Sequence, residues 1–266
     1  MKIDKIENLK FVNHEKQKLI TLTQNSQLNL IFAFVMAKVK EINLGVIDYK
    51  KAWDFQEELF AKNIQRKIDR RNGLEVPDTE NFLLFCEHPH VYTLGKSGER
   101  EHLLKNDDFL KNIGATFYKI NRGGDITYHG PGQIVMYPIF DLEDFFPSIH
   151  QYIHFLEEAV IQTVAEYGIH AGRIDGLTGV WIDGGKPTAR KICAIGVRTS
   201  RWVTMHGIGF NVNTDLKYFS YIVPCGIADK GVASIAGEVG NPVGINEVRE
   251  ILKAKMQELF NFTYEP

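Results

Sequence analysis

The residue best suited to nucleophilic chemistry is Cys225, which stands between a proline and a glycine in Pro224-Cys225-Gly226. Proline and glycine are typical of turns, and a cysteine at a turn is more accessible than one inside a strand or helix. An accessible thiol can ionise and attack an activated acyl group. Free cysteines are often simply buried, so on this pattern alone a structural role for Cys225 stays open. Cys86 and Cys193 lie in apolar runs and are expected in the core.

Further reactive side chains lie in the stretch from Arg122 to Gln133, which also holds four glycines and a proline. Glycine adopts positive φ and lets a ligand approach the backbone, and apolar runs on both sides predict a strand, an irregular loop and a second strand. The Arg, Asp, Tyr and His side chains make the loop a candidate binding segment, although a plain Gly/Pro connection would have the same composition. Its spacing is not that of a dinucleotide- or phosphate-binding loop, and no helix follows it.

A metal site is a further possibility, because Cys86, His88 and His90 alternate and would share one face of a strand. Pro89 interrupts that strand, and no further ligand has the spacing of a zinc site, so we expect no metal. His88 is interpreted instead as a pocket residue, with a structural histidine as the alternative. The same interpretation covers Tyr128, His129 and His206.

Four ordered segments resemble the octanoyl-carrier-protein:protein octanoyltransferases, which carry out the acyl-transfer step of lipoyl synthesis. The segments are Glu87-His88-Pro89 with Val91-Tyr92-Thr93-Leu94-Gly95, the stretch 122–133, Lys191-Ile192-Cys193-Ala194-Ile195-Gly196, and His206-Gly207-Ile208-Gly209-Phe210-Asn211-Val212 followed by Pro224-Cys225-Gly226. The resemblance covers roughly Ile42 to Phe260. His90 departs from it, because the family commonly has proline there, and the loop Gly184–Arg190 is longer and more polar than in many members.

The resemblance implies that Cys225 is the nucleophile and that Lys191 is its partner. A lysine beside a thiol can hold it as a thiolate, and the lysine pKa moves readily on desolvation. Without the resemblance, Lys191 is an ordinary exposed lysine at a strand end. The glycines are expected to let an acyl chain lie against the backbone. The residues expected around the substrate are Arg122, Gly123, Gly124, Asp125, Ile126, Thr127, Tyr128, His129, Ala194, Ile195, Gly196, Gly207, Ile208 and Gly209.

The activity that the resemblance implies is transfer of an octanoyl group to the target lysine of a lipoyl domain, through a thioester on Cys225. The expected donor is octanoyl-acyl carrier protein, which carries the acyl group on phosphopantetheine. The expected acceptors are the lipoyl domains of 2-oxoacid dehydrogenase E2 subunits and the glycine cleavage H protein. The donor is already activated, so no ATP, metal or other cofactor is expected. Two alternatives stay open: an ATP-dependent lipoate- or biotin-protein ligase, which would not need Cys225, and an inactive acyl-binding module of the same fold.

Composition bounds the class of protein. The chain has 266 residues, 44% of them hydrophobic, and a net charge of -2 from 31 basic and 33 acidic residues. This suits one large domain or two small ones with an ample core, and it lacks the basic excess of a nucleic-acid groove. No apolar run reaches the ~20 residues of a spanning helix. A membrane partner is therefore not expected. The 3 cysteines form no C-x-x-C pair, so we expect a cytoplasmic protein without disulfides.

The elements that must position these residues form a mixture of helices and strands. Helices are expected at 50–72, 101–112, 149–167 and 247–260, and strands at 41–49, 81–87, 116–120, 134–140, 179–183, 191–198 and 202–212. Because the last three strands read as an antiparallel meander, the pattern predicts an α+β fold. The resemblance implies a mixed β-sheet with helices packed on one side, as in the catalytic domains of biotin- and lipoate-protein ligases.

Residues 1–35 precede the segments that carry the resemblance. We expect them to be a loose N-terminal extension and residues 36–266 to be a single octanoyltransferase catalytic domain. A strand or helix within 1–35 that packs on the domain is the alternative.

Overall fold

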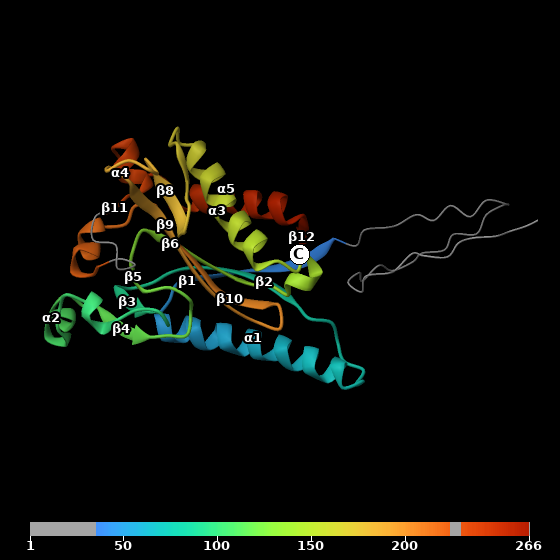
Figure 1. Ribbon diagram of the computed structural model, residues 1–266. Helices are drawn as coiled ribbons and strands as arrows, with labels where there is room; N and C mark the ends of the chain where they lie inside the picture. The colour runs from blue at the N-terminus through green and yellow to red at the C-terminus, as the bar shows by residue number, and fades with distance from the viewer. Residues whose placement is uncertain (1–35, 224–229, 266) are drawn as a thin grey trace, which may run out of the picture. The chain divides into compact units, whose positions relative to one another are not determined.

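A mixed β-sheet runs through the described part of this computed structural model, which comprises residues 36–223 and 230–265 (Figure 1). Residues 1–35 and Cys225 therefore lie outside the described residues. The strand order is β12 (Phe262–Tyr264), β1 (Ala37–Val46), β2 (Asn81–Glu87), β6 (Gln133–Ile139), β10 (Val203–Asn211), β9 (Arg190–Ser200), β8 (Leu177–Ile182) and β7 (Ala171–Ile174), with β11 (Gly231–Val232) pairing with β9.

Parallel and antiparallel pairs both occur in this sheet. Strand β1 runs parallel to β12 and β2, whereas β2, β6, β10, β9, β8 and β7 pair antiparallel in that order. The predicted α+β class and the predicted meander, now β8, β9 and β10, are confirmed.

A second, small sheet has the order β4 (Thr116–Lys119), β3 (Val91–Leu94), β5 (Ile126–His129). Strand β5 lies inside the stretch that the sequence suggested to be one irregular loop, so that interpretation is corrected. Ile126 and Tyr128 are buried at alternate positions, as in a strand. Glycines on both sides hid this short β-branched and aromatic run.

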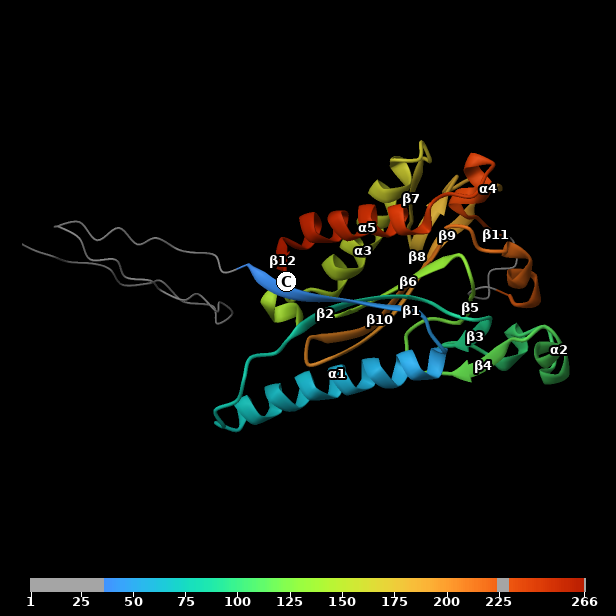
Figure 2. The ribbon, with the colours of Figure 1, turned by 180° about the vertical axis from the view of Figure 1, so that it is seen from behind.

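Helices cover both faces of the large sheet, not one face as the resemblance implied. Helix α1 (Tyr49–Arg71) lies on one face, and α3 (Ile149–Ala165) and α5 (Ile245–Phe260) lie on the other (Figures 1 and 2). Alternate residues of β2 serve the two layers: Leu83 and Phe85 pack in the core with α3 and α5, while Phe82 and Leu84 pack in the core with α1.

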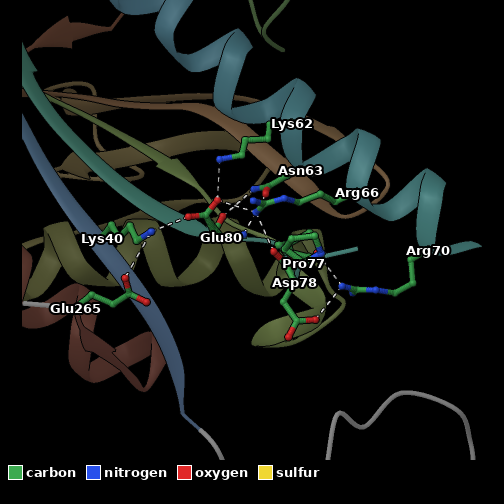
Figure 3. A network of polar contacts seen from close by, with 11 residues as sticks. Lys40, Lys62, Asn63, Arg66, Arg70, Pro77, Asp78, Glu80 and Glu265 are labelled. Atoms are coloured by element: carbon green, nitrogen blue, oxygen red, sulfur yellow. Dashed lines mark hydrogen bonds and ion pairs between the residues drawn. The ribbon is translucent and has the colours of Figure 1, made fainter. Parts of the chain in front are cut away.

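Charged contacts fix the far end of α1 to the sheet. Glu80, which directly precedes β2, lies 2.6 Å from Lys40 Nζ, 2.7 Å from an Arg66 guanidinium nitrogen and 3.1 Å from Lys62 Nζ (Figure 3). The hydrogen bond from Lys40 is the largest cause that lowers the pKa of Glu80 to about 2. The carboxylate therefore stays ionised and links α1, β1 and β2.

The helix expected over 101–112 is two shorter elements, η1 (Arg100–His102) and α2 (Asp107–Asn112). The Asn106 side chain accepts a hydrogen bond from Phe109 N, so α2 begins only after Asn106. His102, the last residue of η1, lines the cavity described below.

Helix α3 begins as predicted, because Ser148 accepts a hydrogen bond from Gln151 N. The remaining short elements are η2 (Leu142–Asp144), η3 (Leu216–Tyr221) and α4 (Ile235–Val239). Within the described residues, no helix has both the length and the apolar character needed to cross a membrane.

Candidate active site

A cavity of about 460 Å³ is bounded by β5 of the small sheet and by β9 and β10 of the large sheet. Its volume is in the range of sites that bind small molecules or acyl groups. The expected site residues that line it are Arg122, Gly124, Asp125, Ile126, Thr127, His129, Lys191, Ala194, Ile195, Gly196, Gly207, Ile208 and Gly209. The structure thus gathers three distant sequence segments around one space.

Two expected substrate-binding residues, Gly123 and Tyr128, do not line this cavity. Gly123 N donates to Val197 O, so it holds the loop against β9. Tyr128 alternates with its cavity-lining neighbours along β5; its ring stacks on Tyr218 and its hydroxyl lies 2.7 Å from His90 Nδ1. Alternation places Tyr128 on the face of β5 opposite to Thr127 and His129. Ile126 shares the face of Tyr128 and still lines the cavity, so the packing of Tyr128 against Tyr218 and His90 accounts for its place outside the cavity.

The glycines of β9 and β10 allow close packing of backbone behind the cavity wall. Gly196 and Gly207 face one another in register. A Cβ on Gly207 would lie 2.1 Å from Met136 O, and one on Gly196 would lie 2.9 Å from Arg122 Cδ. Their lack of a side chain therefore serves the contacts of β10 with β6 and of β9 with Arg122, in addition to exposing backbone to the cavity.

Arg122 brings a buried positive charge to the cavity wall. One guanidinium nitrogen donates to Thr93 O at 2.7 Å and to Thr93 Oγ1 at 3.1 Å, and another donates to Gly123 O at 3.0 Å. These bonds tie the glycine-rich stretch to β3. The side chain therefore shapes the site and contributes a fixed charge to it.

Three buried imidazoles lie at the cavity, and burial keeps all of them neutral. His129 and His206 line it, whereas His88 does not line it but lies with its ring centre 6.0 Å from that of His129. Burial is the largest cause that lowers the pKa of His129 and of His206 to about 3 each and that of His88 to about 4. His129 Nδ1 lies 2.6 Å from Gln133 Oε1, and His206 Nε2 lies 2.8 Å from Asn121 Oδ1. At neutral pH these rings can orient a ligand by hydrogen bonding, but they cannot supply positive charge.

The alternating Cys86, His88 and His90 make separate contacts. His88 Nδ1 donates to Ile47 O at 2.8 Å, and His88 Nε2 lies 2.8 Å from the Tyr137 hydroxyl. His90 is bonded to Tyr128 instead. Among residues 36–223 and 230–265, no group of three or more His, Cys, Asp or Glu side chains is arranged to hold a metal ion.

Lys191 lies near the start of β9, where the sequence predicted a strand to begin. Its Nζ lies 4.6 Å from the centre of the Trp181 ring, and the lysine lines the cavity. Cys193, two residues further on, is fully buried, and burial raises the pKa of its thiol. This agrees with the core role expected of Cys193.

Cys225 lies outside the described residues, but both flanks of its segment are described. Val223 N donates to His102 O at 2.8 Å, and Gly231 N donates to Ala189 O at 3.0 Å. In addition, Val232 pairs with Lys191 between β11 and β9. One flank is therefore tied to a cavity residue, and the other to the strand that carries Lys191.

Several lining residues were not expected from the sequence: Tyr49, Ser97, His102, Tyr137, Gly176, Leu177 and Thr178. Tyr49 and Tyr137 come from α1 and β6, where apolar periodicity marks only a core position. His102 lies in the stretch predicted to be a single short helix, 101–112. The sequence marks candidate site residues only by their chemical type. Residue type does not show which distant segments meet in the fold.

The architecture is that of the lipoate-protein ligase catalytic domains. A bipartite lipoate protein ligase from Thermoplasma acidophilum superimposes with a TM-score of 0.63 at 19% identity, covering 86% of this chain and 86% of that chain. Residues 48–257 match the family described as the lipoyl protein ligase A/B catalytic domain.

Curated relatives define the family more narrowly. The octanoyltransferase of Christiangramia forsetii is 59% identical over 225 residues, which is 84% of this chain and 96% of the relative. The octanoyltransferase of Cytophaga hutchinsonii is 56% identical over 229 residues, covering 84% of this chain and 93% of the relative. The chain belongs to the octanoyltransferases and is an acyltransferase, which confirms the resemblance seen in its motifs.

Proposed function

We propose that the protein transfers an octanoyl group from octanoyl-acyl carrier protein to the target lysine of a lipoyl domain, and that the group passes through a thioester on Cys225. The observation that carries the proposal is a single cavity lined by Lys191 and by the glycine-rich segments of β5, β9 and β10. The flanks of the Cys225 segment are tied to the same surroundings. Expected acceptors are E2 lipoyl domains and the glycine cleavage H protein.

Chain connectivity supports a role for Cys225 at this cavity. Cys225 is two peptide units from Val223, so the Cα atoms of the two residues are at most about 7.6 Å apart. Val223 in turn is hydrogen bonded to His102, which lines the cavity. In the proposed mechanism, the Cys225 thiol attacks an acyl group held in this cavity.

The chemistry needs a thiolate, a proton donor and a site for the acyl chain. The Cys225 thiolate attacks the donor thioester, and the Lys191 ammonium gives a proton to the leaving phosphopantetheine thiol. The acceptor amine then attacks the enzyme thioester, and Cys225 leaves as a thiolate. Both steps exchange already activated acyl groups, so neither ATP nor a metal ion takes part.

Burial of the acyl chain gives the site a means of recognising its substrate. An octanoyl group has about seven apolar carbons beyond the carbonyl, and at ~0.8 kcal/mol per buried CH₂ they contribute roughly 5–6 kcal/mol. Ile126, Ile195 and Ile208 supply apolar side chains to the lining. Affinity should therefore depend on chain length.

The test is a transfer assay with octanoyl-acyl carrier protein and an apo lipoyl domain in the absence of ATP. We expect the lipoyl domain to gain one octanoyl group, and a lipoyl domain with its target lysine replaced by arginine to gain none. Transfer from free octanoate that depends on ATP would identify a ligase instead. Binding of the donor without transfer under either condition would identify an inactive acyl-binding module.

A further inference from the structure

A pair of titratable side chains lines the cavity in addition to Lys191. His102, the last residue of η1, and Asp125, in the turn before β5, approach with 2.6 Å between Nδ1 and Oδ2. The side chain of Asp125 is 11% exposed and that of His102 is 29% exposed. The carboxylate is therefore sheltered, while the imidazole keeps one edge open.

Backbone contacts build this pair on both sides. Asp125 Oδ1 accepts a hydrogen bond from Ile126 N at 2.6 Å, which fixes the carboxylate. A Cβ at position 98 would lie 2.4 Å from that same oxygen, so glycine at position 98 leaves the space that Asp125 occupies. His102 is held through its carbonyl, which accepts from Val223 N, and through its own N–H, which donates to Glu99 O at 3.1 Å.

The contact sets which nitrogen of His102 is available. Among the residues that the structure describes, Nδ1 has no partner in hydrogen-bond geometry, so the approach of Asp125 is a close charge contact and not a directed hydrogen bond. A carboxylate charge 2.6 Å from Nδ1 still favours the tautomer with the proton on Nδ1, which leaves the lone pair on Nε2. Within residues 36–223 and 230–265, no side chain or backbone group hydrogen bonds to Nε2. An imidazole that lies against a carboxylate and belongs to a residue lining the cavity is a candidate general base.

The proton balance of the proposed reaction leaves one proton for such a base. In the first half-reaction, Lys191 protonates the leaving donor thiol and becomes a neutral amine. In the second, the acceptor lysine arrives as an ammonium, because the ordinary pKa of lysine is about 10.4, and it must lose two protons to become an amide N–H. Lys191 can accept one of them and so return to its starting state. The other proton needs a different acceptor.

We propose that His102, oriented by Asp125, accepts this other proton from the incoming acceptor lysine. This inference rests on the proposed function and assigns the pair a step that Lys191 does not perform. The His102 Nε2 lone pair takes one proton from the acceptor lysine, and the lysine nitrogen forms a bond to the acyl carbon. The carbon–sulfur bond breaks with its electron pair going to Cys225, while Lys191 takes the second proton from the nitrogen. His102 then releases its proton to solvent.

The test separates the two half-reactions. Octanoyl-enzyme is formed first and then mixed in a quench-flow instrument with either a saturating apo lipoyl domain or hydroxylamine, whose nitrogen is already neutral at neutral pH. For His102→Gln we expect acyl-enzyme formation at the wild-type rate, deacylation by the lipoyl domain slower by a factor of about 10²–10³, and deacylation by hydroxylamine within about twofold of wild type. Asp125→Asn should show the same selectivity with a smaller loss. His170→Gln, at an exposed position, is the matched control.

Other outcomes overturn the inference in distinguishable ways. Equal losses with both nucleophiles, or slow acyl-enzyme formation, would make the pair structural. A higher KM for the lipoyl domain with an unchanged kcat would make it a docking feature. If wild-type enzyme forms no octanoyl-enzyme at all, the proposed function itself fails, whatever the variants do. Should His102→Gln not fold, Asp125→Asn decides the question by the same comparison.

Discussion

At the residue scale, the site combines few permanent charges with several polar groups that burial keeps neutral. His129 and His206 act through hydrogen bonds to Gln133 and Asn121, and Arg122 supplies a fixed positive charge. Such a lining can orient a thioester carbonyl without binding bulk ions. In the proposed mechanism, proton transfer is assigned to other residues of the cavity lining, Lys191 and the His102–Asp125 pair.

The buried histidines predict that acid weakens the fold. The folded-state pKa values of His88, His129 and His206 are lowered to about 4, 3 and 3. Below the ordinary histidine pKa of about 6.5, the unfolded chain therefore binds protons that the folded chain excludes. The free energy of unfolding should fall as pH drops from about 6.5 toward 4, by up to ~1.4 kcal/mol per pH unit for each histidine.

Urea denaturation across this pH range measures the effect. His206→Gln should reduce the pH slope by about one histidine's share. A free energy of unfolding that stays constant from about pH 7 to pH 5 would contradict the neutral state assigned to these rings.

Lys191 should matter for rate and not for folding. Lys191→Ala removes the group proposed to protonate the donor thiol, so kcat/KM for octanoyl transfer should fall by a factor of ~10²–10⁴. The variant should keep its thermal unfolding midpoint within a few degrees. Lys51→Ala, at an exposed position of α1, is the control and should transfer at the wild-type rate. Wild-type turnover by Lys191→Ala would remove this lysine from the mechanism.

At the element scale, the site depends on how closely the middle strands approach their neighbours. Ala194 pairs with Gly209, and Gly196 pairs with Gly207, so small residues are grouped where β9 and β10 border the cavity. Residue type alone suggested that these glycines serve the substrate. The structure shows that Gly207 also serves the contact with Met136 of β6.

Gly207→Ala should therefore destabilise the protein and not merely alter substrate preference. The new Cβ would lie 2.1 Å from Met136 O, and backbone must move to relieve the overlap. We expect a loss of ~1–3 kcal/mol in the free energy of unfolding, measured by urea denaturation. Gly172→Ala is the matched control, because a Cβ there meets no atom within 4 Å. Equal stability of the two variants would show that the sheet yields at Gly207 without cost.

The elements that were predicted correctly are those with long periodic patterns or explicit caps. Helix α3 begins at its Ser148 cap, and the strands of the meander β8–β10 pair antiparallel as predicted. Strands β3 and β5 were harder because each has only 4 residues and is flanked by glycine or proline. The small sheet they form depends on pairing between segments far apart in the chain, which local periodicity does not encode.

At the scale of the whole molecule, motif order was enough to identify the family and to nominate Lys191 and Cys225. It could not identify the His102–Asp125 contact, because that pair arises from how η1 meets the turn before β5. Nor could it separate Tyr128 from its cavity-lining neighbours without knowing that Ile126–His129 is a strand. Local sequence carries the chemistry of single residues, whereas their juxtaposition depends on tertiary packing.

A chain that begins at Met36 should fold and keep its transfer activity. Strand β1 begins at Ala37 and has partners on both sides, β12 and β2, within the described residues. The match to the family begins at residue 48. Comparison of soluble yield, unfolding midpoint and kcat/KM with the full chain checks this expectation. A large loss in any of them would show that residues 1–35 are integral to the enzyme.

The central claim is that the acyl group passes through Cys225, and intact-mass analysis tests it most directly. Wild-type enzyme mixed with octanoyl-acyl carrier protein, without acceptor, should gain one octanoyl group on the peptide that contains Cys225, and hydroxylamine should remove it. Cys86 and Cys193 should stay unmodified, because burial raises the pKa of both thiols. Cys225→Ala should form no adduct and should not transfer. Absence of an adduct on the wild-type enzyme, together with wild-type transfer by Cys225→Ala, would contradict the account.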